Sequence, residues 1–130
     1  MDRQGVMDYA ASEYGVTPDW PWGGTYADSC VLRHPENRAW FGLLMPVRRE
    51  LLGIGGADVV DILNVKCDPD VSLIARGADG LLPAYHMNKD KWVSVLLDGT
   101  VPDGMVAELL DRSFELTKPK AKKGASHASR

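Results

Sequence analysis

Three short apolar segments in quick succession constrain the fold more than any other feature of this sequence. They span residues 29–33, 39–47 and 59–66 and contain mainly leucine, valine, isoleucine and aromatic side chains. The first link, residues 34–37, has the turn-forming sequence HPEN, and the second, residues 48–58, contains three glycines. Because strands joined by short links usually pair with their chain neighbours, these segments predict an antiparallel meander.

The segment before the meander has the pattern of an amphipathic helix. Gly15 stands where a helix C-terminus favours glycine. The apolar stripe that we expect this helix to bury follows the i, i+3, i+4, i+7 spacing at Met7, Ala10, Ala11 and Tyr14. Residues 18–24 hold two tryptophans, two prolines and a glycine pair, which no regular element accommodates. They predict an aromatic loop that packs over the core.

Two further helices and two further strands complete the pattern. A helix is predicted from Asp68 to Gly77, because Asp68 can cap it and Pro69 suits its first turn. Strands follow around 81–85 and 92–98. The last helix begins at Pro102-Asp103 and is expected to bury Val106, Leu109, Leu110 and Ser113. The order α-β(3)-α-β(2)-α predicts an α+β fold, a two-layer sandwich with helices on a mostly antiparallel sheet.

Charge is divided unevenly along the chain. Residues 118–130 carry five basic residues and no acidic one, and removing these five positive charges from the net charge of −3 leaves −8 for residues 1–117. We therefore predict one acidic domain over residues 1–117, within the size range of a single domain, and a basic disordered tail over 118–130. The two cysteines, Cys30 and Cys67, are isolated, as in a reducing compartment. No signal peptide or membrane-spanning stretch is visible, so a cytoplasmic location without membrane contact is predicted.

Familiar catalytic and ligand motifs each fail at a particular residue. The run GIGG at 53–56 has Asp58 where a dinucleotide loop needs its third glycine. The outline of a calcium loop beginning at Asp68 has Leu73 where that loop needs glycine. The cysteines and histidines lack the spacing of zinc ligands, and a pair of Cys67 with His86 has no motif to support it. We predict no catalytic residues, no metal and no cofactor, and a binding module rather than an enzyme.

The connection between the last two strands is the most distinctive segment. It concentrates polar and aromatic groups that a simple turn does not require, and the candidate ligand- or partner-binding residues are Tyr85, His86, Asn88, Lys89 and Trp92. The alternative is a turn closed by Asn88, with Trp92 and Tyr85 anchoring the edge of the core.

Five short blocks resemble the MmcQ/YjbR family. They are LNVKCDP at 63–69, LPAYHMNK at 82–89, WVSV at 92–95, VPD at 101–103 and SFEL at 113–116. Their order and spacing match the family across residues 5–117. The resemblance implies an α-β(3)-α-β(2)-α arrangement similar to type III secretion chaperones and comparable with frataxin-like CyaY proteins. Members are commonly labelled DNA-binding, and the resemblance brings no shared reaction or catalytic residue.

Nucleic-acid binding requires basic residues that offset the acidic domain. The candidates are Arg33, Arg48, Arg49, Lys89 and Lys91 in the domain and Lys118, Lys120, Lys122 and Lys123 in the tail. Phosphate would repel a body of charge −8 unless these residues gather on one face. Two hypotheses follow: DNA binding through the hairpin ends and the tail, or binding of a small molecule or a protein partner through residues 85–92. Either a monomer or a dimer fits these patterns.

Overall fold

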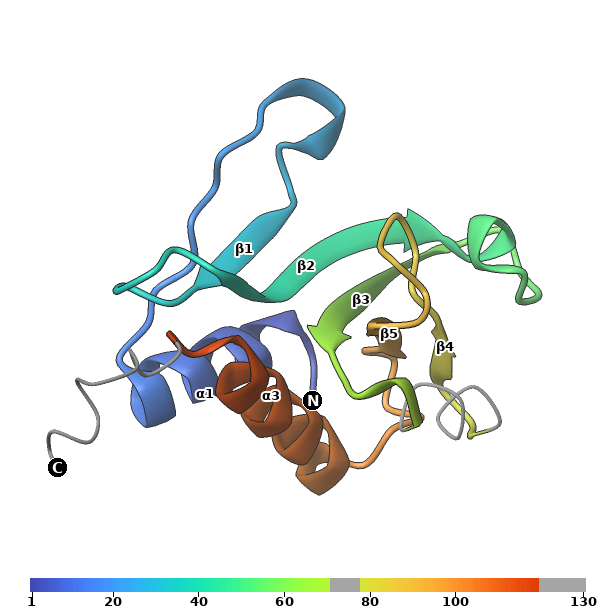
Figure 1. Ribbon diagram of the computed structural model, residues 1–130. Coiled ribbons are helices and arrows are strands. Elements are labelled where there is room, and N and C mark those ends of the chain that lie inside the picture. The colour runs from blue at the N-terminus through green and yellow to red at the C-terminus, as the bar shows by residue number, and fades with distance from the viewer. Residues whose placement is uncertain (71–77, 120–130) are drawn as a thin grey trace, which may run out of the picture.

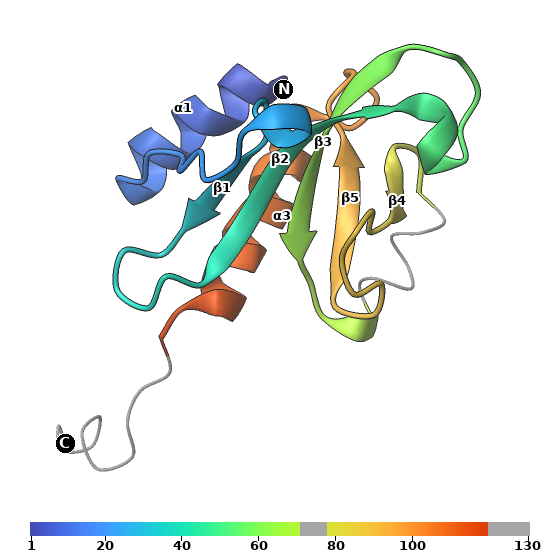
Figure 2. The ribbon, with the colours of Figure 1, turned by 90° about the horizontal axis from the view of Figure 1, so that it is seen from above.

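A five-stranded antiparallel sheet forms the centre of the computed structural model, which describes residues 1–70 and 78–119 (Figure 1). The strand order is β1-β2-β3-β5-β4, as Figure 2 shows from above. The strands are β1 (Cys30–Arg33), β2 (Trp40–Arg48), β3 (Val59–Lys66), β4 (Leu81–Pro83) and β5 (Trp92–Leu96). The predicted meander is confirmed as β1-β2-β3, and the predicted α+β class is confirmed with it.

Two helices, α1 (Arg3–Tyr14) and α3 (Asp103–Thr117), cover the same face of the sheet (Figures 1 and 2). The side chain of Asp2 accepts a hydrogen bond from the Gly5 amide and begins α1, and Gly15, with a φ of 66°, ends it. Two 3₁₀ turns, η1 (Gly24–Tyr26) and η2 (Arg49–Leu52), lie in the connections. No helix within the described residues is long and apolar enough to cross a bilayer.

The predicted buried stripe of α1 was partly wrong. The structure buries Val6 and Ala10, which lie one turn apart on the side of the helix that faces the sheet. Met7 and Tyr14 are half-buried beside them, and Ala11 is exposed. The stripe of α3 is confirmed at Val106, Leu110 and Ser113, which are buried, and Leu109 is half-buried against the same core. The predicted helix from Asp68 to Gly77 lies, from residue 71 onward, outside the described residues, as does the predicted tail from residue 120 onward.

The face beneath the helices, here called the helix face, is closely packed. A bulge near the start of β2 contributes to this packing: Leu32 pairs with Gly42 and Arg33 with Trp40, which leaves Phe41 as the extra residue. Phe41 and Gly42 therefore both point to the helix face. A Cβ on Gly42 would lie 3.0 Å from Leu32 Cδ1. Any larger residue at position 42 would therefore push the Leu32 side chain aside.

The opposite face, here called the loop face, is also apolar, and no α-helix among the described residues lies over it. Its buried side chains are Val31, Leu43, Met45, Val47, Val60, Ile62 and Leu96. Three connections cover it, at residues 15–29, 49–58 and 84–91, and they contribute Trp22, Leu52, Ile54, Tyr85 and Met87. The predicted packing of the aromatic loop is confirmed for Trp22, whereas Trp20 remains 48% exposed. On this face, irregular loops cover the apolar side chains of the sheet, as α1 and α3 do on the other face.

Candidate functional site

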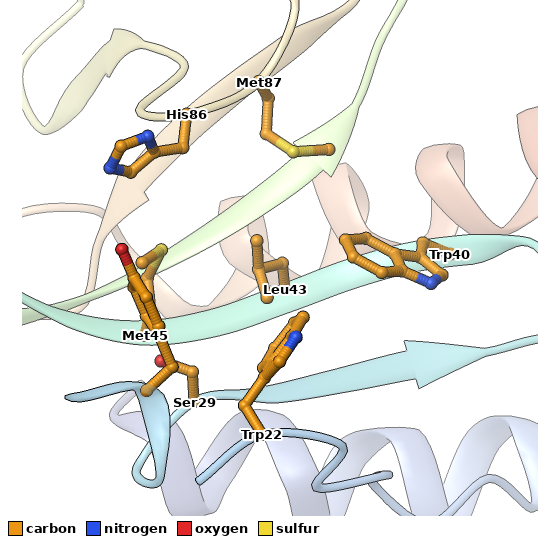
Figure 3. Close-up of a pocket in the computed structure, with 8 residues that line it drawn as sticks. Trp22, Ser29, Trp40, Leu43, Met45, His86 and Met87 are labelled. Atoms are coloured by element: carbon orange, nitrogen blue, oxygen red, sulfur yellow. The ribbon is translucent and has the colours of Figure 1, made fainter. Parts of the chain in front are cut away.

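A cavity of about 250 Å³ opens on the loop face, where two of these connections approach each other across β2 (Figure 3). Buried Leu43, Met45 and Ser29 form its floor. Half-buried Trp22, Trp40 and Met87 form its walls, and exposed Tyr26 and His86 form its rim. Figure 3 shows His86 and Met87 on one side and Trp22 and Ser29 on the other, with Leu43 between them.

The rings that line the cavity are set at steep angles. Trp22 and Trp40 lie edge to face, with ring centroids 5.8 Å apart and planes at 79°. The Arg33 guanidinium lies 5.6 Å from the centroid of Trp40, and its Nε is 3.0 Å from Asp19 Oδ2. Arg33 therefore supports the Trp40 ring from outside the cavity. Within the described part of the chain, no aspartate, glutamate, lysine or arginine lines the cavity.

Two buried polar side chains hold the 84–91 connection in place. Asn64 and Ser94 are fully buried on the loop face, and the Ser94 hydroxyl donates a hydrogen bond to Asn64 Oδ1. Asn64 Nδ2 donates to the Tyr85 carbonyl at 3.0 Å, and the Tyr85 amide donates to Ser94 Oγ at 2.9 Å. Both backbone groups of Tyr85 are therefore tied to the sheet, directly before His86.

His86 has a left-handed backbone, with a φ of 61°. This conformation is uncommon for a residue other than glycine and costs on the order of 1 kcal/mol or more unless its surroundings enforce it. The ring of Tyr85 packs against the imidazole at a centroid distance of 4.1 Å. The Asn64–Ser94 pair and the Tyr85 ring thus position the imidazole at the rim of the cavity.

The structure divides the five residues that the sequence proposed for ligand binding. His86 lines the cavity and Tyr85 lies beside it, against the loop-face core. Asn88 closes the turn instead, because its Oδ1 accepts from the Asp90 amide at 2.9 Å and its carbonyl from the Trp92 amide at 2.9 Å. Lys89 Nζ donates to the Ala84 carbonyl at 2.9 Å, and Trp92 pairs with Lys66 in the sheet. The turn hypothesis therefore describes Asn88 and Trp92, and the ligand hypothesis stays open for Tyr85 and His86.

Sequence reasoning missed most of the cavity. Trp22, Tyr26, Trp40, Met45 and Met87 were not proposed as site residues, although they supply most of its surface. One signal was available: β2 is apolar at nearly every position from Trp40 to Val47, which is typical of a strand covered on both faces. That pattern indicates a second covered face, but not which loops cover it.

The structure does not gather all the predicted DNA-binding residues on one face. Arg33 pairs with the start of β2, whereas Arg48 ends this strand and Arg49 follows it, roughly 25 Å away at the usual strand rise. Arg48 Nε lies 3.1 Å from Glu50 Oε1, and Arg49 Nη1 lies 3.5 Å from Asp98 Oδ2. Lys118 Nζ lies 2.7 Å from Glu115 Oε2.

Lys89 and Lys91 lie at the Arg33 end of the sheet, because they precede Trp92, which pairs with the last residue of β3. Lys120, Lys122 and Lys123 are outside the described residues. DNA binding stays a prediction, with part of its proposed charge already paired within the domain.

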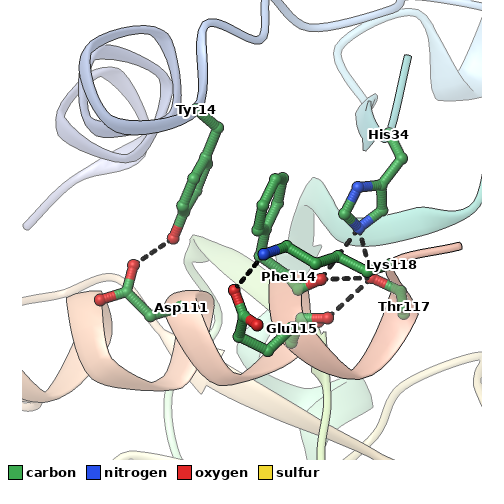
Figure 4. Close-up of polar contacts among 8 residues, drawn as sticks. Tyr14, His34, Asp111, Phe114, Glu115, Thr117 and Lys118 are labelled. Atoms are coloured by element: carbon green, nitrogen blue, oxygen red, sulfur yellow. Dashed lines mark hydrogen bonds and ion pairs between the residues drawn. The ribbon is translucent and has the colours of Figure 1, made fainter. Parts of the chain in front are cut away.

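A second polar cluster joins α1, the β1–β2 turn and the end of α3 (Figure 4). The buried His34 Nε2 lies 3.0 Å from the Phe114 carbonyl and 2.9 Å from Thr117 Oγ1, so Nε2 carries the hydrogen. Burial lowers the pKa of His34. The Tyr14 hydroxyl donates to Asp111, and burial, followed by this bond, raises the pKa of Tyr14. These contacts tie the hairpin and α1 to the end of α3, which is a structural role.

The structure does not bring Cys67 and His86 together. Burial raises the pKa of Cys30 to about 11, so its thiol is protonated at neutral pH. Cys67 is buried in the helix-face core, on the other side of the sheet from His86. In residues 1–70 and 78–119, no three His, Cys, Asp or Glu side chains lie close enough together to hold a metal ion. The absence of a catalytic role stays a prediction.

Comparisons with known proteins agree with the fold and with the motif blocks. The family model YjbR matches residues 11–116. The uncharacterized protein YyaQ of Bacillus subtilis is 41% identical over 118 residues, which cover 91% of this chain and 99% of YyaQ. The uncharacterized protein YjbR of Escherichia coli K12 is 32% identical over 54 residues, which cover 41% of this chain and 46% of that protein.

Solved structures extend this agreement to three dimensions. The crystal structure of a Pseudomonas syringae protein is 40% identical and superposes with a TM-score of 0.87, covering 91% of this chain and 100% of that one. A Deinococcus radiodurans protein shares the fold, with 24% sequence identity and a TM-score of 0.70. That match covers 98% of this chain and 86% of the other chain. The resemblance inferred from five short blocks is confirmed over most of the domain, and this chain belongs to the YjbR family.

Proposed function

We propose that this protein binds a compact, uncharged, planar aromatic molecule in the loop-face cavity. The observation that carries the proposal is the meeting of Trp22 and Trp40 with a positioned His86 around one apolar opening. A volume of about 250 Å³ suits a single or fused ring. The proposed role is binding without catalysis.

The lining favours a ring over other ligands. Aromatic faces and edges attract a planar ring in offset or edge-to-face contact, and the Met45 and Met87 thioethers adapt to its outline. A charged ligand would lose its hydration without gaining a charged partner among the described lining residues. The Ser29 hydroxyl and the His86 imidazole can hydrogen-bond one or two polar substituents.

Ligand binding is preferred to DNA binding because of what surrounds each set of residues. Arg33, Arg48 and Arg49 each lie beside a carboxylate, which reduces the positive charge available to a phosphate backbone. The cavity, in contrast, presents unpaired apolar surface next to a residue in a strained backbone conformation, and both features are common at binding sites.

Calorimetric titration with methyl 4-hydroxybenzoate tests the proposal. This probe is a single uncharged ring with a phenol hydroxyl, and we expect submillimolar affinity and a rise in Tm when it is present in excess. Trp22→Ala should weaken binding at least roughly tenfold, because it removes one wall of the cavity.

Trp20→Ala is the matched control. Trp20 lies in the same loop, is 48% exposed and does not line the cavity, so its removal should leave the affinity unchanged. Equal weakening by the two substitutions would show that the loop as a whole, and not the cavity, matters. Failure of the wild-type protein to bind the probe would overturn the proposal.

A further inference from the structure

The loop-face cavity continues into a second, larger opening. This second cavity has a volume of about 500 Å³ and shares Tyr26, Ser29 and Met45 with the first. It runs on along β2 toward Val47 and reaches Leu51 of η2 and Val59 at the start of β3. The two openings therefore adjoin along β2, and together they are here called the groove.

The chemistry of the groove changes along its length. Rings and thioethers line the first cavity, whereas the apolar lining added by the second is mainly aliphatic, from Val47, Leu51 and Val59. Polar side chains also line the second cavity, at Thr25 and Asp28 of the 15–29 connection and at Arg48, which is paired with Glu50 and marks the far end. Along β2, a ligand that fills the groove would therefore be aromatic at one end and aliphatic toward the other.

Exposed apolar side chains gather at the second cavity. Among residues 1–70 and 78–119, the exposed large apolar side chains are Trp20, Tyr26, Leu51, Val59 and Met105. Three of these five line the second cavity, and Leu51 and Val59 are 52% and 60% exposed. Scattered exposed apolar residues are ordinary, but a cluster that extends an apolar cavity is typical of a contact surface for a ligand.

We infer that the ligand carries a short aliphatic chain on its ring, and that this chain lies along Met45, Val47, Leu51 and Val59. The inference rests on the proposed function, because the ring must occupy the first cavity. The Met45-to-Val47 step spans roughly 6.6 Å at the usual strand rise, which matches a chain of about four to six carbons before the polar end at Arg48.

A series of alkyl esters of 4-hydroxybenzoate, from methyl through ethyl and butyl to hexyl and octyl, tests the inference by calorimetry. Affinity should rise about two- to fourfold per methylene through the butyl ester and level off beyond the hexyl ester. The double variant Leu51→Asn with Val59→Thr keeps the branched shapes of the side chains and removes the apolar wall. It should flatten the rise with chain length and leave the affinity for the methyl ester unchanged.

Met105→Gln is the matched control, because Met105 is 43% exposed on α3 and lines neither cavity. It should retain the wild-type dependence on chain length. All three altered residues are exposed, and an unchanged Tm in the absence of ligand verifies that the variants are folded.

A series that stays flat in the wild-type protein, although the methyl ester binds, would overturn this inference and leave the proposed function standing. The same slope in the double variant as in the wild type would also overturn it, because the chain would then lie elsewhere. Failure of the methyl ester itself to bind would overturn the proposed function, and this inference with it.

Discussion

The two faces of the sheet bury similar side chains in different ways. On the helix face, α1 and α3 pack side chains from successive turns against strands whose side chains alternate toward them. On the loop face, three irregular connections contribute single large side chains, such as Trp22 and Met87, to a comparable surface. Helices fill a surface evenly because their side chains recur at a fixed spacing, whereas loops leave gaps between anchors. The loop face therefore holds the aromatic cavity and the groove.

The polar contacts on the two faces indicate that one face mainly stabilises the fold and the other mainly supports the cavity. On the helix face, hydrogen bonds join separate elements, as in the contacts of His34 with the end of α3. The loop face uses its buried pair, Asn64 and Ser94, to hold the backbone of a surface connection. We expect substitutions on the helix face to act mainly on the free energy of unfolding and those on the loop face mainly on binding.

The largest expected effect separates two adjacent leucines of β2. Leu44 is fully buried on the helix face, and Leu44→Ala should lower the free energy of unfolding by about 3–5 kcal/mol, because it leaves a closed void. Leu43 lines the loop-face cavity, so Leu43→Ala only enlarges an existing opening and should cost about 2 kcal/mol. Urea denaturation of both variants measures the difference. Equal costs would break the comparison between the faces.

A somewhat smaller effect is expected at the buried polar pair. Asn64→Ala removes the donor to the Tyr85 carbonyl and the acceptor of the Ser94 hydroxyl, and should cost about 1–3 kcal/mol. It should also weaken binding of methyl 4-hydroxybenzoate, because His86 loses its support. Urea denaturation and titration measure the two effects. Asn88→Ala, in the exposed turn of the same connection, serves as the control, and a similar loss of affinity there would contradict a special role for Asn64.

The free energy of unfolding should depend on pH through His34, which is buried at the end of α3 on the helix face. Burial is the main cause that lowers the pKa of His34 below its ordinary value of 6.5, and nearby Lys118 lowers it further. The hydrogen bond to the Phe114 carbonyl and the charges of Glu36 and Glu115 oppose this shift without cancelling it. The unfolded chain therefore binds a proton at a pH where folded His34 does not, so stability falls as the pH drops through 6.5 toward the folded pKa. The slope contributed by His34 is at most about 1.4 kcal/mol per pH unit.

His34→Gln tests this dependence, because glutamine keeps a hydrogen-bond donor and does not titrate. The difference in unfolding free energy between wild type and variant should shrink as the pH falls from about 7 to about 5. Urea denaturation at several pH values measures it. A difference that is constant with pH would show that His34 titrates alike in the folded and unfolded states.

The smallest expected effect has the opposite sign. His86→Gly relieves the left-handed backbone at φ 61° and should raise the free energy of unfolding by up to about 1 kcal/mol. The same change removes the imidazole from the rim and should weaken binding of methyl 4-hydroxybenzoate. Thermal unfolding and titration of one sample measure both quantities. A variant that is destabilised, or that binds the probe as well as wild type, would remove the case for a strained binding residue.

Most of the fold could be predicted from local patterns. The bounds of β3 were predicted to the residue, and the glycine that ends α1 was identified, because both depend on neighbours in the chain. The candidate site could be predicted only in part. His86 stood out as a polar residue between apolar strands, but the wall formed by Trp22 did not, since no periodic pattern connects residue 22 with residue 86.

The sequence by itself determined the first and last helices, the antiparallel meander and the family, because propensity, periodicity and motif order are local properties. Only the tertiary structure decided that Arg48 and Arg49 lie far from Arg33, and that each has a carboxylate beside it. It also decided that the 15–29 and 84–91 connections meet over β2. The physical reason is that loop positions depend on which strands pair and on how large side chains find space on a shared face, and both are settled only when the whole chain packs.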